Sequence, residues 1–122
     1  MANEEVRVVG VDYEPDVRDM MKELLELDGY QVRTASDADA AMTAIAEFDP
    51  VCVILDLKLP TVSGIELAHR VRSLYGTGIV LIVLTGSSRP VDHHAAEAAG
   101  VDYVLEKPLD VELLRRMLPP VG

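Results

Sequence analysis

The stretch Val51-Cys52-Val53-Ile54-Leu55, followed directly by Asp56, decides the fold class. It is an almost wholly apolar run of strand length, and two further runs, Val6 to Val11 and Ile79 to Leu84, have the same β-branched character without polar alternation. Strands that are apolar on both faces are typical of a parallel sheet covered by helices on both sides. These runs therefore predict the central strands of such a sheet.

Segments with helical spacing of apolar residues lie between the runs. Ser63 followed by Glu66 is a capping-box pattern, and Ser36 followed by Asp39 is a looser version, so we expect helices to begin after these serines. Gly100 is expected to end a further helix. The five helical segments are 17–25, 38–45, 65–74, 95–99 and 111–118, and weaker strand candidates lie at 30–34 and 102–105.

The order of elements is strand then helix, repeated five times. Strictly alternating elements give a parallel sheet with right-handed crossovers, and 122 residues are too few for an eight-fold barrel, which needs ~250. We expect an α/β fold, a (βα)5 doubly wound five-stranded parallel sheet of flavodoxin-like order 2-1-3-4-5. Ligands of such sheets bind beyond the carboxyl ends of the strands, so the residues there are the candidate site.

The composition excludes several classes of protein. With 122 residues and 49% hydrophobic side chains the chain is expected to be one domain, with its core at about residues 6–118 and short tails. It has 21 acidic residues against 11 Lys and Arg, a net charge of −10, which argues against nucleic acid or anionic membrane as direct partners. One cysteine excludes an internal disulfide. Because neither a membrane-spanning run nor a signal-peptide pattern is visible, we expect a cytoplasmic protein.

Four polar residues follow the predicted strands. Asp12 and Asp56 end the first and third strands, Thr85 ends the fourth, and Lys107 follows the fifth. Each alone is explained by a turn, a helix cap or a surface position, but the predicted fold brings all four to one edge. Clustered carboxylates suit a hard cation such as Mg²⁺, and a lysine and a hydroxyl suit a phosphoryl group. A carboxylate among them can act as the nucleophile and form an aspartyl phosphate.

The residues around these positions form motifs in a characteristic order. They are Val9-Gly10-Val11-Asp12; Val53-Ile54-Leu55-Asp56-Leu57-Lys58-Leu59-Pro60 with Gly64; Val83-Leu84-Thr85-Gly86; and Ala98-Ala99-Gly100-Val101-Asp102-Tyr103-Val104-Leu105-Glu106-Lys107-Pro108. Each motif alone is weak evidence, but together, in this order and spacing, they are highly specific. The chain resembles the CheY-like receiver domain of two-component response regulators over essentially its whole length.

The resemblance implies a role for each matched residue. Asp56 is the expected phosphoacceptor. Its phosphoryl group would come from a sensor histidine kinase or a phosphotransfer protein. Asp12, Asp56 and the backbone carbonyl of Lys58 are the expected ligands of Mg²⁺. Thr85 and Lys107 are expected to contact the phosphoryl group. The domain would assist its own aspartyl phosphorylation and dephosphorylation without being a conventional enzyme.

The resemblance also implies a switch and an output surface. Tyr103 matches an aromatic residue that moves inward as Thr85 moves, and the Lys107–Pro108 peptide bond matches one that is typically cis. The switched surface is formed by the fourth helix, the fifth strand and the fifth helix, where a downstream protein or an output domain would bind. Dimerisation through this surface, the cognate kinase, the pathway and the output stay open, as does whether the chain stands alone or is part of a longer protein.

Tyr13 departs from the family pattern, which usually has a second acid at this position. A phenol is a poor ligand for Mg²⁺, so we expect weaker Mg²⁺ binding, with Glu14 as a candidate replacement ligand. The alternative is a pseudo-receiver, an interaction module with a degenerate metal site. Lys58 and Ser87, each two residues after a site residue, are candidate modulators of the phosphoryl site.

A flavin- or nucleotide-binding protein of the same fold is a third hypothesis, since a fold alone does not decide function. It would need a loop that holds phosphate after the first strand. The actual loop, Asp12 to Asp16, has three acids besides Tyr13 and Pro15 and no glycine, so it would repel a phosphate in the absence of a cation.

Overall fold

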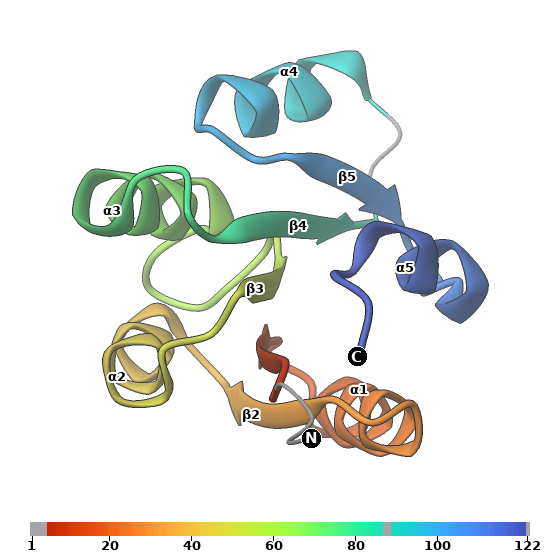
Figure 1. The fold of residues 1–122 in the computed structure, drawn as a ribbon. Coiled ribbons are helices and arrows are strands. Elements are labelled where there is room, and N and C mark those ends of the chain that lie inside the picture. Colours follow the sequence, from red (N-terminus) through yellow and green to blue (C-terminus); the bar gives the residue numbers. More distant parts are fainter. Residues whose placement is uncertain (1–4, 87–88, 122) are drawn as a thin grey trace.

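Strands and helices alternate five times in the computed structural model, which describes residues 5–86 and 89–121 (Figure 1). The strands are β1 (Arg7–Val11), β2 (Gln31–Ala35), β3 (Cys52–Asp56), β4 (Val80–Thr85) and β5 (Tyr103–Glu106). The helices are α1 (Pro15–Leu27), α2 (Ala38–Phe48), α3 (Gly64–Tyr75), α4 (Pro90–Ala98) and α5 (Val111–Met117). The alternation predicted from the sequence is confirmed.

The five strands form one parallel sheet in the order β2-β1-β3-β4-β5. This confirms the predicted fold class and strand order. Each strand begins one residue later than expected, and β2, β3, β4 and β5 also end one residue later, so that Asp56 and Thr85 are the last residues of their strands. The two side chains are thus fixed by the sheet instead of by loops.

Helices cover both faces of the sheet, with α1 and α5 on one side and α2, α3 and α4 on the other (Figure 1). The apolar residues form two clusters that match this division. One contains Met21 and Leu25 of α1 and Leu114 of α5, whereas the other contains Leu67 of α3 and Ala96 of α4. The runs predicted to be apolar on both faces are buried on both faces, which is why they lack polar alternation.

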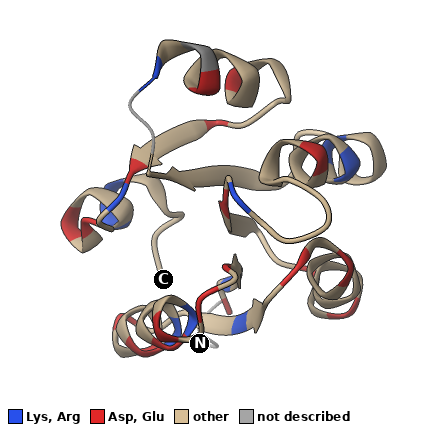
Figure 2. Cartoon of the chain, turned by 180° about the vertical axis from the view of Figure 1, so that it is seen from behind, with Lys and Arg blue, Asp and Glu red and all other residues tan. Residues whose placement is uncertain are grey.

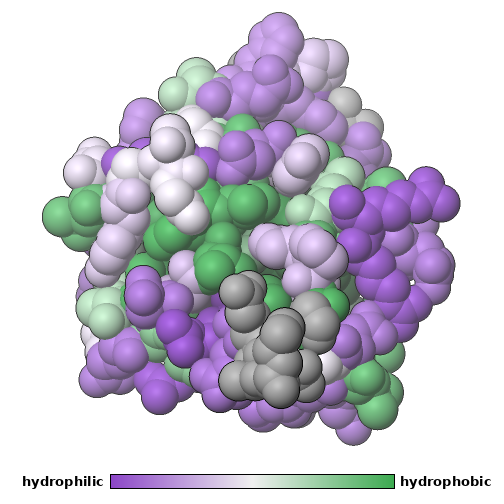
Figure 3. All heavy atoms as spheres, viewed as in Figure 1, coloured by the Kyte–Doolittle hydropathy of each residue, from purple (hydrophilic) through white to green (hydrophobic). Residues whose placement is uncertain are grey.

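Most charged residues lie on the helices and loops; those in the strands are Arg7, Arg33, Asp56 and Glu106. Figure 2 shows acidic positions on each helix, while the middle of the sheet is almost free of charge. On the face seen in Figure 1, apolar side chains gather near the centre and hydrophilic ones surround them (Figure 3). None of the helices in the described ranges is long and apolar enough to cross a membrane.

The helix caps test the sequence patterns one by one. Ser63 caps α3, its hydroxyl accepting a hydrogen bond from the Glu66 N–H at 3.3 Å, as expected. The expected cap at Ser36 is wrong, because α2 begins at Ala38 and its cap is therefore Asp37, whose carboxylate accepts from the Ala40 N–H at 2.8 Å. A carboxylate at this position also favours the positive end of the helix dipole.

The partly buried Arg72 ties together the loops at the amino ends of β4 and β5. The Arg72 guanidinium donates to the carbonyl of Gly100 at 2.7 Å and to that of Ile79 at 2.6 Å. It also pairs with Asp102 at 2.7 Å, while the same carboxylate oxygen accepts from the Leu81 N–H. Gly100 follows α4 with φ +93°, which confirms it as the residue that ends that helix.

Candidate functional site

Asp56 is the last residue of the central strand β3 and lies at the carboxyl edge of the sheet. Its side chain is only 9% exposed. The carboxylate oxygen Oδ1 accepts a hydrogen bond from the backbone N–H of Lys58 at 3.1 Å. The other oxygen, Oδ2, faces Lys107. The pairing of β3 with β1 and β4 and the turn to Lys58 therefore fix this carboxylate at the edge of the sheet.

Gly64 lets the following helix approach this strand closely. A Cβ atom at position 64 would lie 2.3 Å from the carbonyl oxygen of Asp56 and 2.9 Å from the Cα of Leu57. The Gly64 N–H instead donates to the Leu57 carbonyl at 2.8 Å. Because no side chain fits there, glycine is required for the loop 57–63 to fold back beside Asp56.

Asp12 follows β1 and is completely buried. Its Oδ1 accepts from the Glu14 N–H at 2.9 Å. One nitrogen of Arg18 donates to the carbonyl oxygens of Asp12 and Tyr13, at 2.8 and 2.9 Å. These contacts hold the loop between β1 and α1 in the conformation that turns the Asp12 carboxylate toward Asp56.

Lys107 joins the two acids. Its Nζ lies 3.0 Å from Oδ2 of Asp56 and 3.4 Å from Oδ2 of Asp12, and its backbone N–H donates to the Thr85 carbonyl at 2.7 Å. A residue following β5 thus reaches the ends of β3 and β1, as the parallel sheet predicts. The three side chains form a compact charge cluster.

The electrostatics of this cluster follow from burial. Loss of solvent raises the pKa of Asp12 above its ordinary value, and the charge of Asp56 raises it further, although the Glu14 N–H and the Lys107 ammonium partly oppose the rise. Burial by itself would lower the pKa of Lys107, but its hydrogen bond to Asp56 and the charges of both acids raise the pKa overall. Lys107 therefore stays protonated, and one ammonium is shared by two buried carboxylates.

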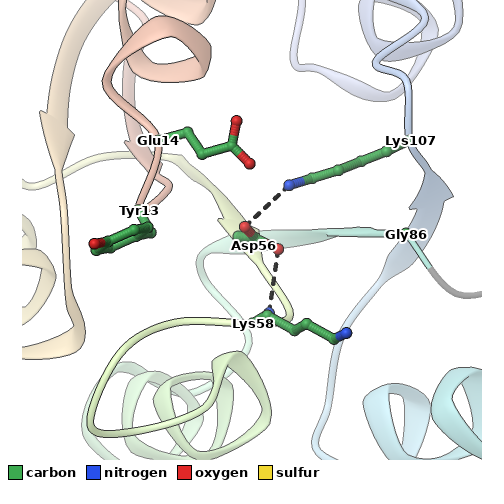
Figure 4. A pocket seen from close by; sticks show the side chains of 6 residues that line it. All are labelled: Tyr13, Glu14, Asp56, Lys58, Gly86 and Lys107. Carbon is green, nitrogen blue, oxygen red and sulfur yellow. Dashed lines mark hydrogen bonds and ion pairs between the residues drawn. The ribbon is translucent and has the colours of Figure 1, made fainter.

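A cavity of about 340 Å³ opens over Asp56. Figure 4 shows the Glu14 carboxylate pointing toward the Lys107 side of this cavity, whereas the Tyr13 ring points away from Asp56. The Tyr13 residue is 62% exposed. The residues that line the cavity are Tyr13, Glu14, Asp56, Lys58, Gly86 and Lys107.

The structure places the other predicted residues as follows. Thr85 is 2% exposed at the end of β4, in the strand next to Asp56, and Tyr103 on β5 is 43% exposed. The Lys107–Pro108 peptide bond is cis, as expected. Ser87 lies outside the described residues. The sequence therefore identified the residues that the fold brings together at this edge.

The oxygen donors at the cavity suit a hard cation, but they are few. Asp12 and Asp56 supply buried carboxylates, and Glu14 lines the cavity from the same loop as Asp12. Within residues 5–86 and 89–121, no group of three or more His, Cys, Asp or Glu residues is arranged to hold a metal. Mg²⁺ prefers oxygen ligands and keeps several waters, so the donor set fits this ion with little protein coordination.

Arg18 is a site residue that the sequence did not reveal. It lies within α1, where an arginine is expected to point to solvent, and its role depends on the path of the preceding loop. Its contacts are to backbone carbonyls, which leave no signature in the sequence.

The comparisons with known proteins agree with this geometry. A family model described as "Response regulator receiver domain" matches residues 8–119. The response regulator MprA of Mycolicibacterium vanbaalenii is 34% identical over 125 residues, covering 96% of this chain and 54% of that protein. The chain spans about half the length of several curated relatives that it matches, 45% of TcrX of Mycobacterium tuberculosis and 54% of MprA.

Solved structures of response regulators have the same fold. The chemotaxis response regulator CheY4 of Vibrio cholerae has a TM-score of 0.86 and 26% identity, over 94% of this chain and all (100%) of that one. A response regulator protein from Burkholderia pseudomallei, solved with a phosphorylated aspartic acid, a calcium ion and citrate, has a TM-score of 0.86 and 26% identity, over 94% of this chain and 67% of that one.

Proposed function

The chain belongs to the response regulator receiver domain family, and on this premise we propose that it is a signalling switch operated by phosphorylation of Asp56. The observation that carries the proposal is the contact between Lys107 Nζ and Asp56 Oδ2, at 3.0 Å, beneath an open cavity. The Asp56 carboxylate is largely buried, but the cavity leaves it open to a small donor, and the Lys107 ammonium is fixed beside it. Such a carboxylate is suited to attack an incoming phosphoryl group.

In this mechanism an oxygen of Asp56 attacks the phosphorus atom of the donor. The new bond joins Asp56 to phosphorus, while the bond from phosphorus to the donor's leaving atom breaks and the leaving group takes its electron pair. Lys107 neutralises part of the charge on the phosphoryl oxygens, and the Thr85 hydroxyl donates a hydrogen bond to one of them. The donor is a sensor histidine kinase or a phosphotransfer protein, and the domain turns over no other substrate.

Mg²⁺ is the proposed cofactor, held by the carboxylates of Asp12 and Asp56 and the backbone carbonyl of Lys58. When bound, it withdraws charge from the phosphoryl oxygens. The calcium ion named with the phosphorylated aspartic acid in the Burkholderia pseudomallei structure supports a divalent cation here. We infer weak binding, because the exposed Tyr13 supplies no carboxylate and Glu14 is the remaining candidate ligand.

Mg²⁺ binding is testable at position 13. Replacing Tyr13 by Asp adds a carboxylate beside Asp12, so Mg²⁺ affinity is expected to rise about tenfold or more, the scale of one added charged ligand. Titration of backbone amide NMR signals with Mg²⁺ measures this directly, and Tyr13→Asn is the matched control without added charge. Equal affinities in the wild type and both variants would contradict the role proposed for this position.

The signal passes from the phosphoryl group to a protein surface. We propose that Thr85 moves toward phosphorylated Asp56, that Tyr103 turns inward from its exposed position, and that α4, β5 and α5 change their shared surface. A downstream protein or an output domain binds there, and this surface is also the candidate for a homodimer.

The proposed unit is one domain over residues 1–122, with its core at about residues 6–118. We propose that it acts in the cytoplasm and makes no direct contact with nucleic acid or membrane.

A second function is favoured by a specific observation, the outward direction of Tyr13. In a pseudo-receiver the cation site is degenerate and the domain acts by protein contact alone. Of the residues that the structure describes, two carboxylates, those of Asp12 and Asp56, lie buried at the candidate cation position, and this small number fits such a module.

Mass spectrometry of the intact protein separates the two functions. The protein is incubated with Mg²⁺ and acetyl phosphate, and the expected result is a gain of one phosphoryl group that is absent in Asp56→Asn. Asp37→Asn is the matched control, because it removes a carboxylate outside the Asp56 cavity while asparagine can still cap α2, and it is expected to gain the phosphoryl group. No gain by the folded wild-type protein with any donor would favour the pseudo-receiver.

A further inference from the structure

Lys58 is an unpaired cation in a strongly acidic protein. Across the described residues, the Lys58 ammonium and the Arg116 guanidinium are the cationic groups for which the structure shows no hydrogen bond or ion pair. With 21 acidic residues against 11 Lys and Arg in the chain, a carboxylate partner is readily available to most cations. The unpaired state of Lys58 is therefore a property of its place in the fold.

That place is the cavity over Asp56. Lys58 lines the cavity, and its backbone N–H is bonded to Asp56 Oδ1 at 3.1 Å. In Figure 4 the Lys107 side chain reaches Asp56 from above, while the Lys58 side chain starts below the carboxylate and its ammonium points away from it. Because the lysine stem is flexible and its backbone touches Asp56, the ammonium can reach a group attached to that carboxylate. Arg116, in contrast, is on α5 and is not among the residues that line this cavity.

The charges at the cavity leave a deficit that Lys58 can fill. The ammonium of Lys107 is already shared by Asp12 and Asp56, at 3.4 and 3.0 Å, and Glu14 adds another carboxylate to the lining. A phosphoryl group brings about −1.5 to −2 further charges. Among the described residues, the buried carboxylates at this cavity are those of Asp12 and Asp56, so the unpaired ammonium of the lining residue Lys58 is the counter-charge that the chain itself can provide.

We propose that the Lys58 ammonium binds the oxygens of the phosphoryl group at Asp56 and so allows Asp56 to be phosphorylated without a divalent cation. This inference rests on the proposed function. With acetyl phosphate as donor, the Asp56 oxygen bonds to phosphorus, the bond from phosphorus to the acyl oxygen breaks, and acetate leaves with the electron pair. No proton is transferred, and Lys58 acts through its charge and its hydrogen bonds alone.

The experiment measures phosphorylation with acetyl phosphate in EDTA and, separately, at saturating Mg²⁺, by intact mass. The wild-type protein is expected to gain one phosphoryl group in EDTA, at a reduced but measurable rate. In Lys58→Ala the ratio of the EDTA rate to the Mg²⁺ rate is expected to fall about tenfold, the scale of one charge-assisted hydrogen bond. Lys58→Arg is expected to keep most of the ratio. Arg116→Ala removes an equally unpaired cation away from the cavity and is expected to leave the ratio unchanged.

A second measurement does not depend on the reaction. Inorganic phosphate is titrated in EDTA while the backbone amide signals around Asp56 are followed by NMR, and Lys58→Ala is expected to weaken binding about tenfold relative to the wild type and Arg116→Ala.

The inference is overturned if the wild type is phosphorylated in Mg²⁺ but not in EDTA. It is also overturned if Lys58→Ala matches Arg116→Ala in both the rate ratio and phosphate binding. A wild-type protein that is not phosphorylated even in Mg²⁺ would instead contradict the proposed function itself.

Discussion

Replacing Lys107 by Met tests whether one ammonium holds the two buried acids in place. Asp12 is fully buried, the Asp56 side chain is 9% exposed, and Lys107 Nζ lies within 3.4 Å of both. Removing one partner of a buried ion pair is destabilising by about 3–5 kcal/mol. Since the Lys107 side chain is 27% exposed, solvent screening reduces our expected loss to about 2–3 kcal/mol at pH 7.

The loss is measurable by thermal and urea unfolding. For a domain of 122 residues, each kcal/mol shifts the melting temperature by about 4 °C, so we expect a decrease of about 8–12 °C. The urea midpoint falls with an unchanged m-value, because the folded state keeps its compactness.

The stability lost in Lys107→Met is expected to depend on pH. The pKa of Asp12 is already raised by burial and by Asp56, and loss of the ammonium raises it further. A carboxyl group whose pKa is higher in the folded than in the unfolded protein binds more protons in the folded state. Its ionised form therefore lowers stability fully at pH values above the raised pKa, and this loss of stability disappears as the pH falls through that pKa. The difference between Lys107→Met and the wild type should therefore shrink between pH 7 and pH values near 4.

Two controls complete the test. Adding Asp12→Asn to Lys107→Met removes one uncompensated charge and should recover at least half of the lost stability, whereas Arg116→Met removes a cation without partners and should change stability little. A loss below about 0.5 kcal/mol at pH 7, or an equal loss at pH 7 and pH 4, would show that the Lys107 ammonium does not stabilise the two buried acids.

Three further predictions concern the scaffold. Gly64→Ala places a Cβ 2.3 Å from the Asp56 carbonyl and should lower the free energy of unfolding by about 2–4 kcal/mol in urea titration, with Gly86→Ala, where nothing lies within 4 Å, as the control. Arg72→Met leaves the partly buried carbonyls of Gly100 and Ile79 without this donor and should lower the free energy of unfolding by about 2–3 kcal/mol. Arg70→Met breaks only exposed pairs at 3.7 and 3.8 Å and should lower it by less than about 0.5 kcal/mol; equal losses would contradict the importance of the Arg72 contacts. Burial raises the pKa of Cys52 to about 12, so an alkylating reagent at pH 8 should label it only in denaturant, and labelling of the native protein would contradict its burial.

The fold was predictable because its signals are strong and local. Apolar runs such as Val51 to Leu55 indicate buried parallel strands, and strict alternation with helices leaves few topologies. The convergence of Asp12, Asp56 and Lys107 then follows from the geometry of a parallel sheet, in which all carboxyl ends meet at one edge.

The remaining features depend on contacts between distant segments or on the last residue of an element. The sequence pattern favoured Ser36 as a cap, but α2 begins at Ala38, so the residue directly before it, Asp37, occupies the cap position. The contacts of Arg18 are to backbone oxygens, and the direction of Tyr13 is set by the loop that Arg18 holds. The unpaired state of Lys58 is a property of the whole surface, so no local pattern could reveal it.

The central claim is that Asp56 is the phosphorylated residue, and the most direct measurement locates the phosphoryl group in the chain. The protein is phosphorylated with acetyl phosphate in Mg²⁺ and reduced with borohydride, which converts an aspartyl phosphate to homoserine, and its peptides are sequenced by mass spectrometry. We predict homoserine at position 56 and unmodified acids at positions 12 and 14. Homoserine at another acid, or its absence from a folded protein after treatment, would contradict the account.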